Sequence, residues 1–129
     1  MPEAGLGVAL RTLREKRGFQ VREVATLAAV DHAYIYRLES GKKANPSEEI
    51  LSKLLKTLKP SDRDADIVRW LADQPEADEK LVEYVLGDPD IEFEAFMMAA
   101  GVRHRGQTRP DPQTLIRRAQ LALQAADDE

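Results

Sequence analysis

The chain contains no cysteine and only two histidines, which narrows the chemistry open to it. Without cysteine, there are no disulfides, thiolate metal ligands or thiol nucleophiles. A metal centre would have to rely on carboxylates. The alternating acids Asp62, Asp64 and Asp66 lack the glycine and the closing glutamate of a calcium loop. We interpret them as the acidic first turn of a helix, and we expect neither a metal nor another cofactor.

Long apolar runs and recognisable catalytic motifs are also lacking. No stretch reaches the ~18 apolar residues that cross a bilayer, and no basic segment precedes an apolar one at the start. We therefore expect a cytoplasmic protein without a membrane segment. The chain has neither a glycine-rich phosphate loop nor a nucleophile elbow, so an enzyme is not expected.

Charge is distributed unevenly along the chain. Residues 1–59 hold 11 lysines and arginines against 7 acids, a net charge of +4. Residues 60–129 hold 8 against 16, a net charge of −8, and the two parts sum to the overall −4. A basic block followed by an acidic one suggests two roles: the first block can approach a polyanion, which would repel the second. A chance distribution of surface charge explains the pattern equally well.

Apolar residues recur at helical spacing along the chain, and no strand-like alternation stands out. Glycines at positions 18 and 41 are expected to end helices, whereas Asp31 and Pro46-Ser47 are expected to start them. Asp90 is expected to start another, which ends at Gly101. The pattern predicts an all-α fold with a basic domain over 1–60 and an acidic helical region over 61–129.

Between Arg11 and Leu54, two short predicted helices flank a turn of small residues that includes Ala28-Ala29. Small side chains let two helices cross closely, as in a helix-turn-helix unit, whose second helix enters the major groove of DNA. Further features of this stretch are Leu13-Arg14, Arg17-Gly18, Glu23-Val24-Ala25, Val30-Asp31, the string YIYRLESGK (34–42) and Pro46-Ser47.

Through these features, residues 6–58 resemble the lambda-repressor-like helix-turn-helix family, also called the XRE family. The resemblance implies a five-helix DNA-binding domain with its recognition helix over about 32–40. It also implies a structural role for Glu39, for which we expect pairing with a basic neighbour such as Arg14. Tyr34, Ile35 and Leu38 are expected to lean on the core.

The same resemblance places four residues against DNA bases: His32, Ala33, Tyr36 and Arg37. Arg37 is the strongest candidate because its guanidinium can pair with O6 and N7 of guanine, and Ala33 can touch a thymine methyl group. Alternatives stay open for three of them. Arg37 can bind a phosphate or pair with neighbours of Glu39. His32 can be a solvent-exposed helix start, and Tyr36 can cover Ile35.

Contacts to the DNA backbone are expected on both sides of the recognition helix. The candidates are Gln20, Arg22, Lys42, Lys43 and Asn45. Members of the family often carry Thr-Gln where this chain has Gln20-Val21. The usual phosphate-binding glutamine is therefore missing or displaced by one residue, and Gln20 can instead cap its helix.

The acidic half contains an apolar cluster that is wider than a single helical stripe. Its members are Ile91, Phe93, Phe96, Met97 and Met98. We expect it to hold a homodimer or another protein partner, because one domain offers little interface for tight operator binding; burial in the chain's own core is the alternative. We therefore predict a sequence-specific transcriptional regulator, a repressor by default, that binds a pseudo-palindromic operator in double-stranded DNA. Two rivals are an antitoxin that also represses its own promoter and an adaptor that has lost DNA binding.

Overall fold

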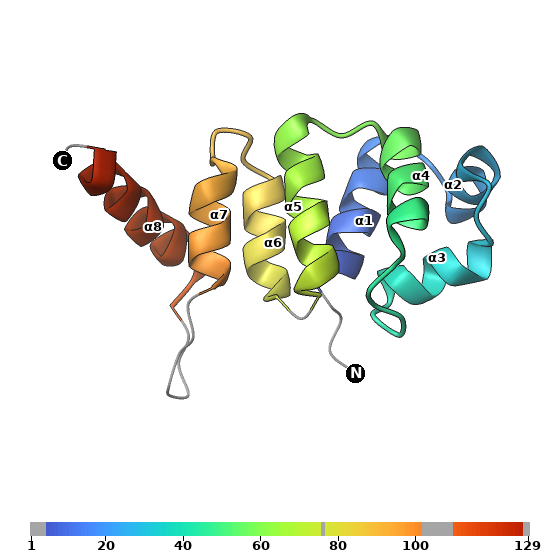
Figure 1. The fold of residues 1–129 in the computed structure, drawn as a ribbon, viewed down its shortest axis with the longest axis horizontal. Helices are drawn as coiled ribbons and strands as arrows, with labels where there is room; N and C mark the ends of the chain where they lie inside the picture. The colour runs from blue at the N-terminus through green and yellow to red at the C-terminus, as the bar shows by residue number, and fades with distance from the viewer. Residues whose placement is uncertain (1–4, 76, 102–109, 128–129) are drawn as a thin grey trace.

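The computed structural model describes residues 5–75, 77–101 and 110–127. Over these ranges the chain forms α-helices and no strand, which confirms the all-α fold class (Figure 1). The helices are α1 (Gly5–Lys16), α2 (Val21–Ala28), α3 (His32–Glu39), α4 (Glu48–Leu58), α5 (Asp62–Asp73), α6 (Glu79–Leu86), α7 (Phe93–Ala100) and α8 (Pro112–Asp127). None of them has both the length and the apolar content to span a bilayer.

Most of the predicted helix starts and stops are confirmed. Asp31 and Ser47 cap α3 and α4, accepting hydrogen bonds from the backbone N–H groups of Ala33 (3.1 Å) and Ile50 (3.2 Å). After α1 and α3 the chain turns through glycines at positions 18 and 41, with φ angles of 72° and 80°. This left-handed conformation costs little only for glycine, which explains why these residues end the helices.

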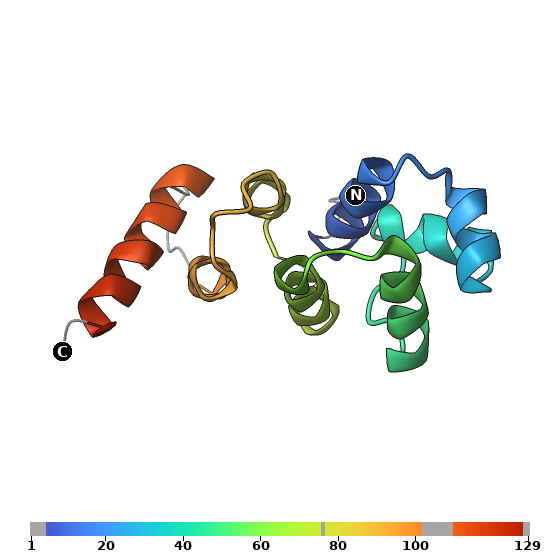
Figure 2. The same ribbon diagram turned by 90° about the horizontal axis from the view of Figure 1, so that it is seen from above.

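The helices follow one another along an elongated molecule (Figures 1 and 2). Helices α1 to α4 gather at one end and α8 lies at the other, with α5, α6 and α7 between them. Helix α1 packs against α3 on one side and against α5 and α6 on the other, so a single hydrophobic core runs past residue 60. A division into domains at that residue stays a prediction.

Gly7 allows the close approach of α1 and α3. A β-carbon built at this position would collide with the carbonyl oxygens of Leu38 and Glu39 at the end of α3. The neighbouring side chains Leu6 and Val8 are also buried. The first half of α1 is thus enclosed on several sides, because the acidic half of the chain covers the face that α3 leaves open.

The prediction that Asp90 starts a helix is wrong, because α7 begins at Phe93 with Glu92 as its N-cap residue. The guanidinium of Arg63 on α5 donates hydrogen bonds to the carbonyl oxygens of Asp88 (2.6 Å) and Ile91 (2.9 Å). These bonds direct both carbonyls toward α5, so residues 88–91 form a turn instead of a helical start.

An ion pair joins the two halves of the chain at the surface. Arg69 on α5 lies 2.6 Å from the carboxylate of Glu48 in the first turn of α4. The hydrogen bonds from Arg69 and from Ser52 lower the pKa of Glu48 from its ordinary value, because they stabilise the charged carboxylate. Both side chains are exposed, so the pair contributes little stability.

Candidate nucleic-acid interface

Helices α2 and α3 form a compact pair joined by a three-residue turn. The turn begins at Ala29, which adopts a left-handed conformation (φ 57°, ψ 47°), and the backbone N–H of Val30 donates to the carbonyl of Ala25 (3.0 Å). Buried Val24 on α2 and Ile35 on α3 belong to the same core. At this corner Ala28 is buried, and Ala25 and Val30 pack against the core.

The outward face of α3 carries the residues that the sequence singled out. His32, Tyr36 and Arg37 are exposed and Ala33 is partly exposed, whereas Ile35 and Leu38 are buried in the core. The Tyr36 residue is 55% exposed, so it is available to a partner even though its ring meets the edge of the His32 ring. Within the described residues, nothing forms a hydrogen bond or an ion pair with the Arg37 guanidinium.

The sequence of this region matches a known domain family, and the match agrees with the arrangement of its helices. The model of a helix-turn-helix domain matches residues 5–66, a range that covers α1 to α4 and the start of α5. Residues 5–66 are a helix-turn-helix domain. The range extends past the predicted boundary at residue 60 and takes in the first turn of the fifth helix.

A curated relative is similar to part of the helix-turn-helix domain. It is the HTH-type transcriptional repressor RghR of Bacillus subtilis (strain 168), with 42% identity over 53 residues. The match covers 41% of this chain and 39% of the relative, so the chain spans well under half of that protein.

A buried ion pair fixes the end of α3 against α1. Arg14 donates from Nε and Nη2 to the two carboxylate oxygens of Glu39, at 2.7 and 2.9 Å, and from Nη1 to the carbonyl of Phe19 at 2.8 Å. The hydrogen bond to Glu39 raises the pKa of Arg14 above its ordinary value. The predicted structural pairing of Glu39 with Arg14 is confirmed, and it ties α1, the following loop and α3 together.

The loop after α3 folds back on that helix. The backbone N–H of Lys43 donates to the carbonyl of Arg37 at 3.0 Å, and its ammonium lies 5.3 Å from the centre of the Tyr34 ring. Lys42 and Asn45 are exposed on the same loop, where Asn45 adopts a left-handed φ of 55°. The sequence assigned Tyr34 to the core alone, and nothing in its spacing indicated that it also positions Lys43.

At the start of α2, Gln20 and Arg22 are exposed as a backbone contact requires. Gln20 is the N-cap residue, and its backbone N–H donates to the Glu23 carboxylate at 2.8 Å. Val21 is buried, so the position where the family often carries glutamine packs into the core in this chain. Gln20 and Arg22 are the predicted phosphate contacts that stay exposed at this helix start.

The structure divides the apolar cluster of the acidic half. Ile91 and Phe96 are buried in the chain's own core. The rings of Phe96 and Trp70 meet edge to face, with their centres 5.3 Å apart. Neither Ile91 nor Phe96 is available to a partner, and Phe93 is partly buried. Met97 and Met98, 41% and 40% exposed, are the two members of the cluster that count as exposed.

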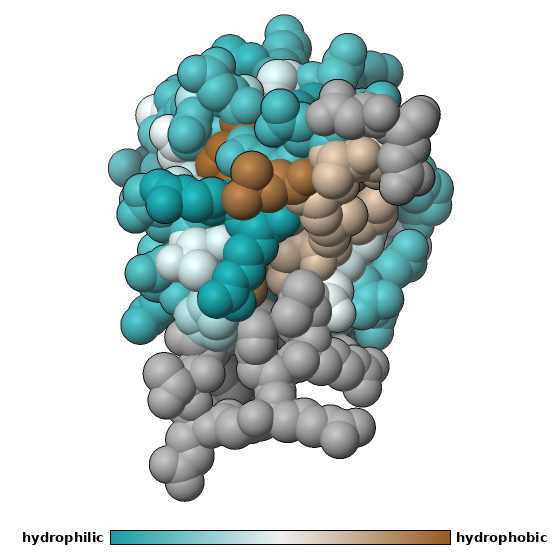
Figure 3. Space-filling view, turned by 90° about the vertical axis from the view of Figure 1, so that its left-hand side faces the viewer, coloured by the Kyte–Doolittle hydropathy of each residue, from teal (hydrophilic) through white to brown (hydrophobic). Residues whose placement is uncertain are grey.

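Helix α8 adds a further exposed apolar residue at this end. Leu121 is 60% exposed, and an apolar area crosses this end of the molecule (Figure 3). We refer to Met97, Met98 and Leu121 as the C-terminal apolar residues.

Proposed function

We propose that the chain is a DNA-binding transcriptional repressor that occupies a pseudo-palindromic operator as a homodimer. The observation that carries this proposal is the outward face of α3. Three long polar or aromatic side chains (His32, Tyr36 and Arg37) are exposed there, while the opposite face anchors the helix to the domain. The similarity to a protein named as a transcriptional repressor supports the same function.

Each residue of that face has a role in this proposal. Arg37 pairs with O6 and N7 of a guanine, Ala33 contacts a thymine methyl group, and His32 and Tyr36 contact bases or sugars nearby. Around them, Lys42, Lys43, Asn45, Gln20 and Arg22 hold phosphates and set the register of the helix on the groove. Occupying a promoter in this way excludes polymerase.

The salt dependence of DNA binding tests whether the chain binds duplex DNA at all. We expect the affinity of the intact chain for duplex DNA to fall steeply as salt rises, because phosphate contacts release counterions. Fluorescence anisotropy with a labelled duplex measures this dependence. Absence of salt-sensitive binding to any duplex would contradict the proposal and would favour an adaptor that binds only protein.

Lys43→Ala is expected to weaken binding to all duplexes by a similar factor. Its ammonium, held near the Tyr34 ring, contacts a phosphate in this proposal, and phosphates carry no sequence information. The slope of log affinity against log salt should fall by about one unit. Lys80→Ala, which removes an exposed lysine from α6, is the matched control and should leave the slope unchanged. A change in sequence preference with Lys43→Ala would contradict a phosphate contact.

We assign the dimer contact to the C-terminal apolar residues. One helix-turn-helix domain reads a short stretch of groove, and a symmetric dimer gains a second half-site about one helical turn (~34 Å) away. The C-terminal apolar residues lie at the end of the molecule opposite α3, and the acidic half that carries them is repelled by DNA phosphates. A contact at that end leaves both recognition helices free.

The double variant Met97→Asp/Leu121→Asp is expected to be monomeric at concentrations where the intact chain is a dimer. Two carboxylates in an apolar contact lose their hydration without gaining a partner, which opposes association. Sedimentation velocity at micromolar concentration measures both species. Leu27→Asp, which changes an exposed leucine at the other end of the molecule, should leave the dimer intact. A monomeric intact chain would contradict this assignment.

A further inference from the structure

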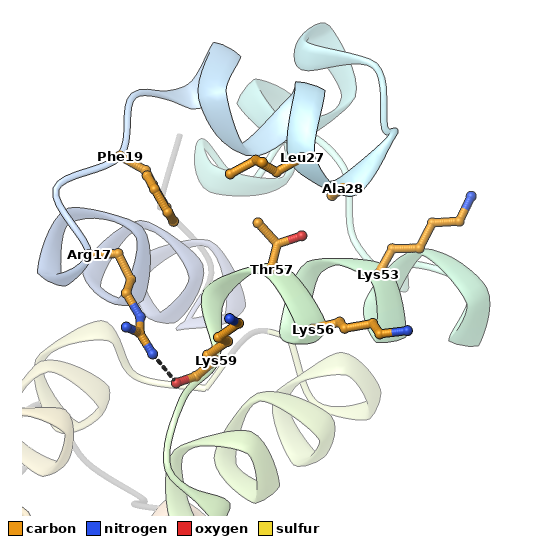
Figure 4. Close-up of a pocket in the computed structure, with 8 residues that line it drawn as sticks. All are labelled: Arg17, Phe19, Leu27, Ala28, Lys53, Lys56, Thr57 and Lys59. Atoms are coloured by element: carbon orange, nitrogen blue, oxygen red, sulfur yellow. Dashed lines mark hydrogen bonds between the residues drawn. The ribbon is translucent and has the colours of Figure 1, made fainter.

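A groove between α2 and α4 is left unused by the proposed DNA contacts. It has a volume of about 400 Å³, and the residues that line it come from α2, from α4 and its C-cap, and from the segment that joins α1 to α2 (Figure 4). None of these lining residues belongs to α3. A volume of this size accommodates a small organic molecule.

Apolar side chains form part of the groove. Leu27 and Ala28 face it from α2, with Phe19 beside them, and Leu27 lies across from Thr57 of α4 (Figure 4). Leu27 is 62% exposed, the largest exposed fraction among the large apolar residues that the structure describes. An apolar group that filled the groove would cover it, with a gain of ~25 cal/mol for each Å² removed from water.

The charged side chains around the groove all carry the same sign. The described lining residues include four cations (Arg17, Lys53, Lys56 and Lys59) and no acid. Lys53 has a partner already, the Glu49 carboxylate at 3.5 Å. The ammonium groups of Lys56 and Lys59 form no ion pair within the described residues. Two cations are therefore available for an anionic group.

Arg17 removes an obstacle to anion binding at this place. The groove lies at the C-terminal end of α4, where free carbonyl groups create a negative potential. Arg17 donates to the carbonyl oxygen of Leu58 at 2.7 Å. It also donates to the carbonyl oxygen of Lys59 at 2.6 Å (Figure 4), so a positive charge satisfies both carbonyls.

We propose that this groove binds a small organic anion, an aromatic or branched apolar body that carries a carboxylate or sulfonate. The body packs on Leu27 and Phe19, and the anionic group lies between Lys56 and Lys59. A DNA phosphate fits these observations less well, because it has no apolar part to cover Leu27. Since Leu27 belongs to the first helix of the helix-turn-helix unit, an occupant that bridges α2 and α4 alters DNA affinity. This last consequence alone rests on the proposed function.

The test uses the intact chain without DNA and a pair of aromatic probes. Anilinonaphthalene sulfonate supplies an apolar body with an anionic group, and phenylnaphthylamine supplies nearly the same body without charge. Titrations followed by amide chemical shifts in NMR report both the affinity and the place of binding. We expect saturable shifts at Leu27, Lys56 and Thr57, and tighter binding of the sulfonate than of the neutral probe. Shifts confined to the C-terminal apolar residues would overturn the proposal.

Variants separate the two parts of the site. Lys56→Glu should weaken sulfonate binding about fivefold and leave the neutral probe unchanged, because it reverses one surface charge beside the anion. Leu27→Asp should weaken both probes about tenfold. Lys80→Glu makes the same charge change on α6 and should have no effect. Equal losses with Lys56→Glu and Lys80→Glu would overturn the proposal, since net charge alone would then account for binding.

DNA affinity measured with and without the sulfonate keeps the two proposals distinguishable. If the probe binds in the groove but the chain binds no duplex, the ligand site stands and the proposed function fails. If the chain binds DNA but the groove takes no probe, the ligand site fails alone.

Discussion

Glu39→Ala is expected to lower the free energy of unfolding by about 2–4 kcal/mol. The substitution leaves the Arg14 guanidinium, whose side chain is only 14% exposed, without its carboxylate partner. One hydrogen bond remains, from Arg14 to the carbonyl of Phe19, and it does not neutralise the charge. Urea unfolding of the intact chain, followed by circular dichroism, measures the change.

Two comparisons test whether the loss comes from the buried pair. Glu15→Ala removes a carboxylate from α1 that is 64% exposed, so it should cost under about 0.5 kcal/mol. The double variant Arg14→Met/Glu39→Leu removes both charges and should recover part of the stability, because no unpaired charge is left behind. A loss below about 1 kcal/mol with Glu39→Ala would contradict the structural role of the pair.

Arg37→Ala is expected to weaken binding to the preferred operator by about 1–3 kcal/mol and to relax preference at one base position. The guanidinium is exposed on α3 and is held by no other described residue, so it is available to a guanine. Binding isotherms for the operator and for duplexes with each base substituted at every position measure both effects.

Arg37→Lys is the matched control because it keeps the charge and removes the planar pair of donors. It should retain more affinity than Arg37→Ala but lose discrimination at the same base position, since bidentate pairing needs the guanidinium. A uniform loss for all duplexes with Arg37→Ala would instead identify a phosphate contact. That outcome would contradict base recognition by this residue.

Local signals in the sequence predicted much of the helix-turn-helix domain. Asp31 and Ser47 cap helices because their side chains accept from the next turn, and this depends only on neighbouring residues. The buried face of α3 follows from the spacing of Ile35 and Leu38, whereas its predicted base contacts came from the family resemblance. The pairing of Glu39 with Arg14, 25 positions apart, came from resemblance to a family and not from a local signal.

Features that depend on contacts between distant segments escaped prediction. Arg63 determines where α7 begins by binding carbonyls 25 and 28 positions away, and no local pattern marks a residue that binds them. A residue that binds a partner and a residue in the chain's own core are both apolar. The apolar character of Ile91 and Phe96 therefore could not show that they are buried in the core. The groove between α2 and α4 arises only when Leu27 of α2 and the lysines of α4 and its C-cap are brought together.

Selection of bound duplexes from a random pool by the intact chain is the most direct test of recognition by α3. We expect one enriched motif with two-fold symmetry and half-sites about one helical turn apart. We also expect Arg37→Ala to remove a guanine preference from each half-site. Failure to enrich any motif, or enrichment of a motif that Arg37→Ala leaves unchanged, would contradict base recognition by α3.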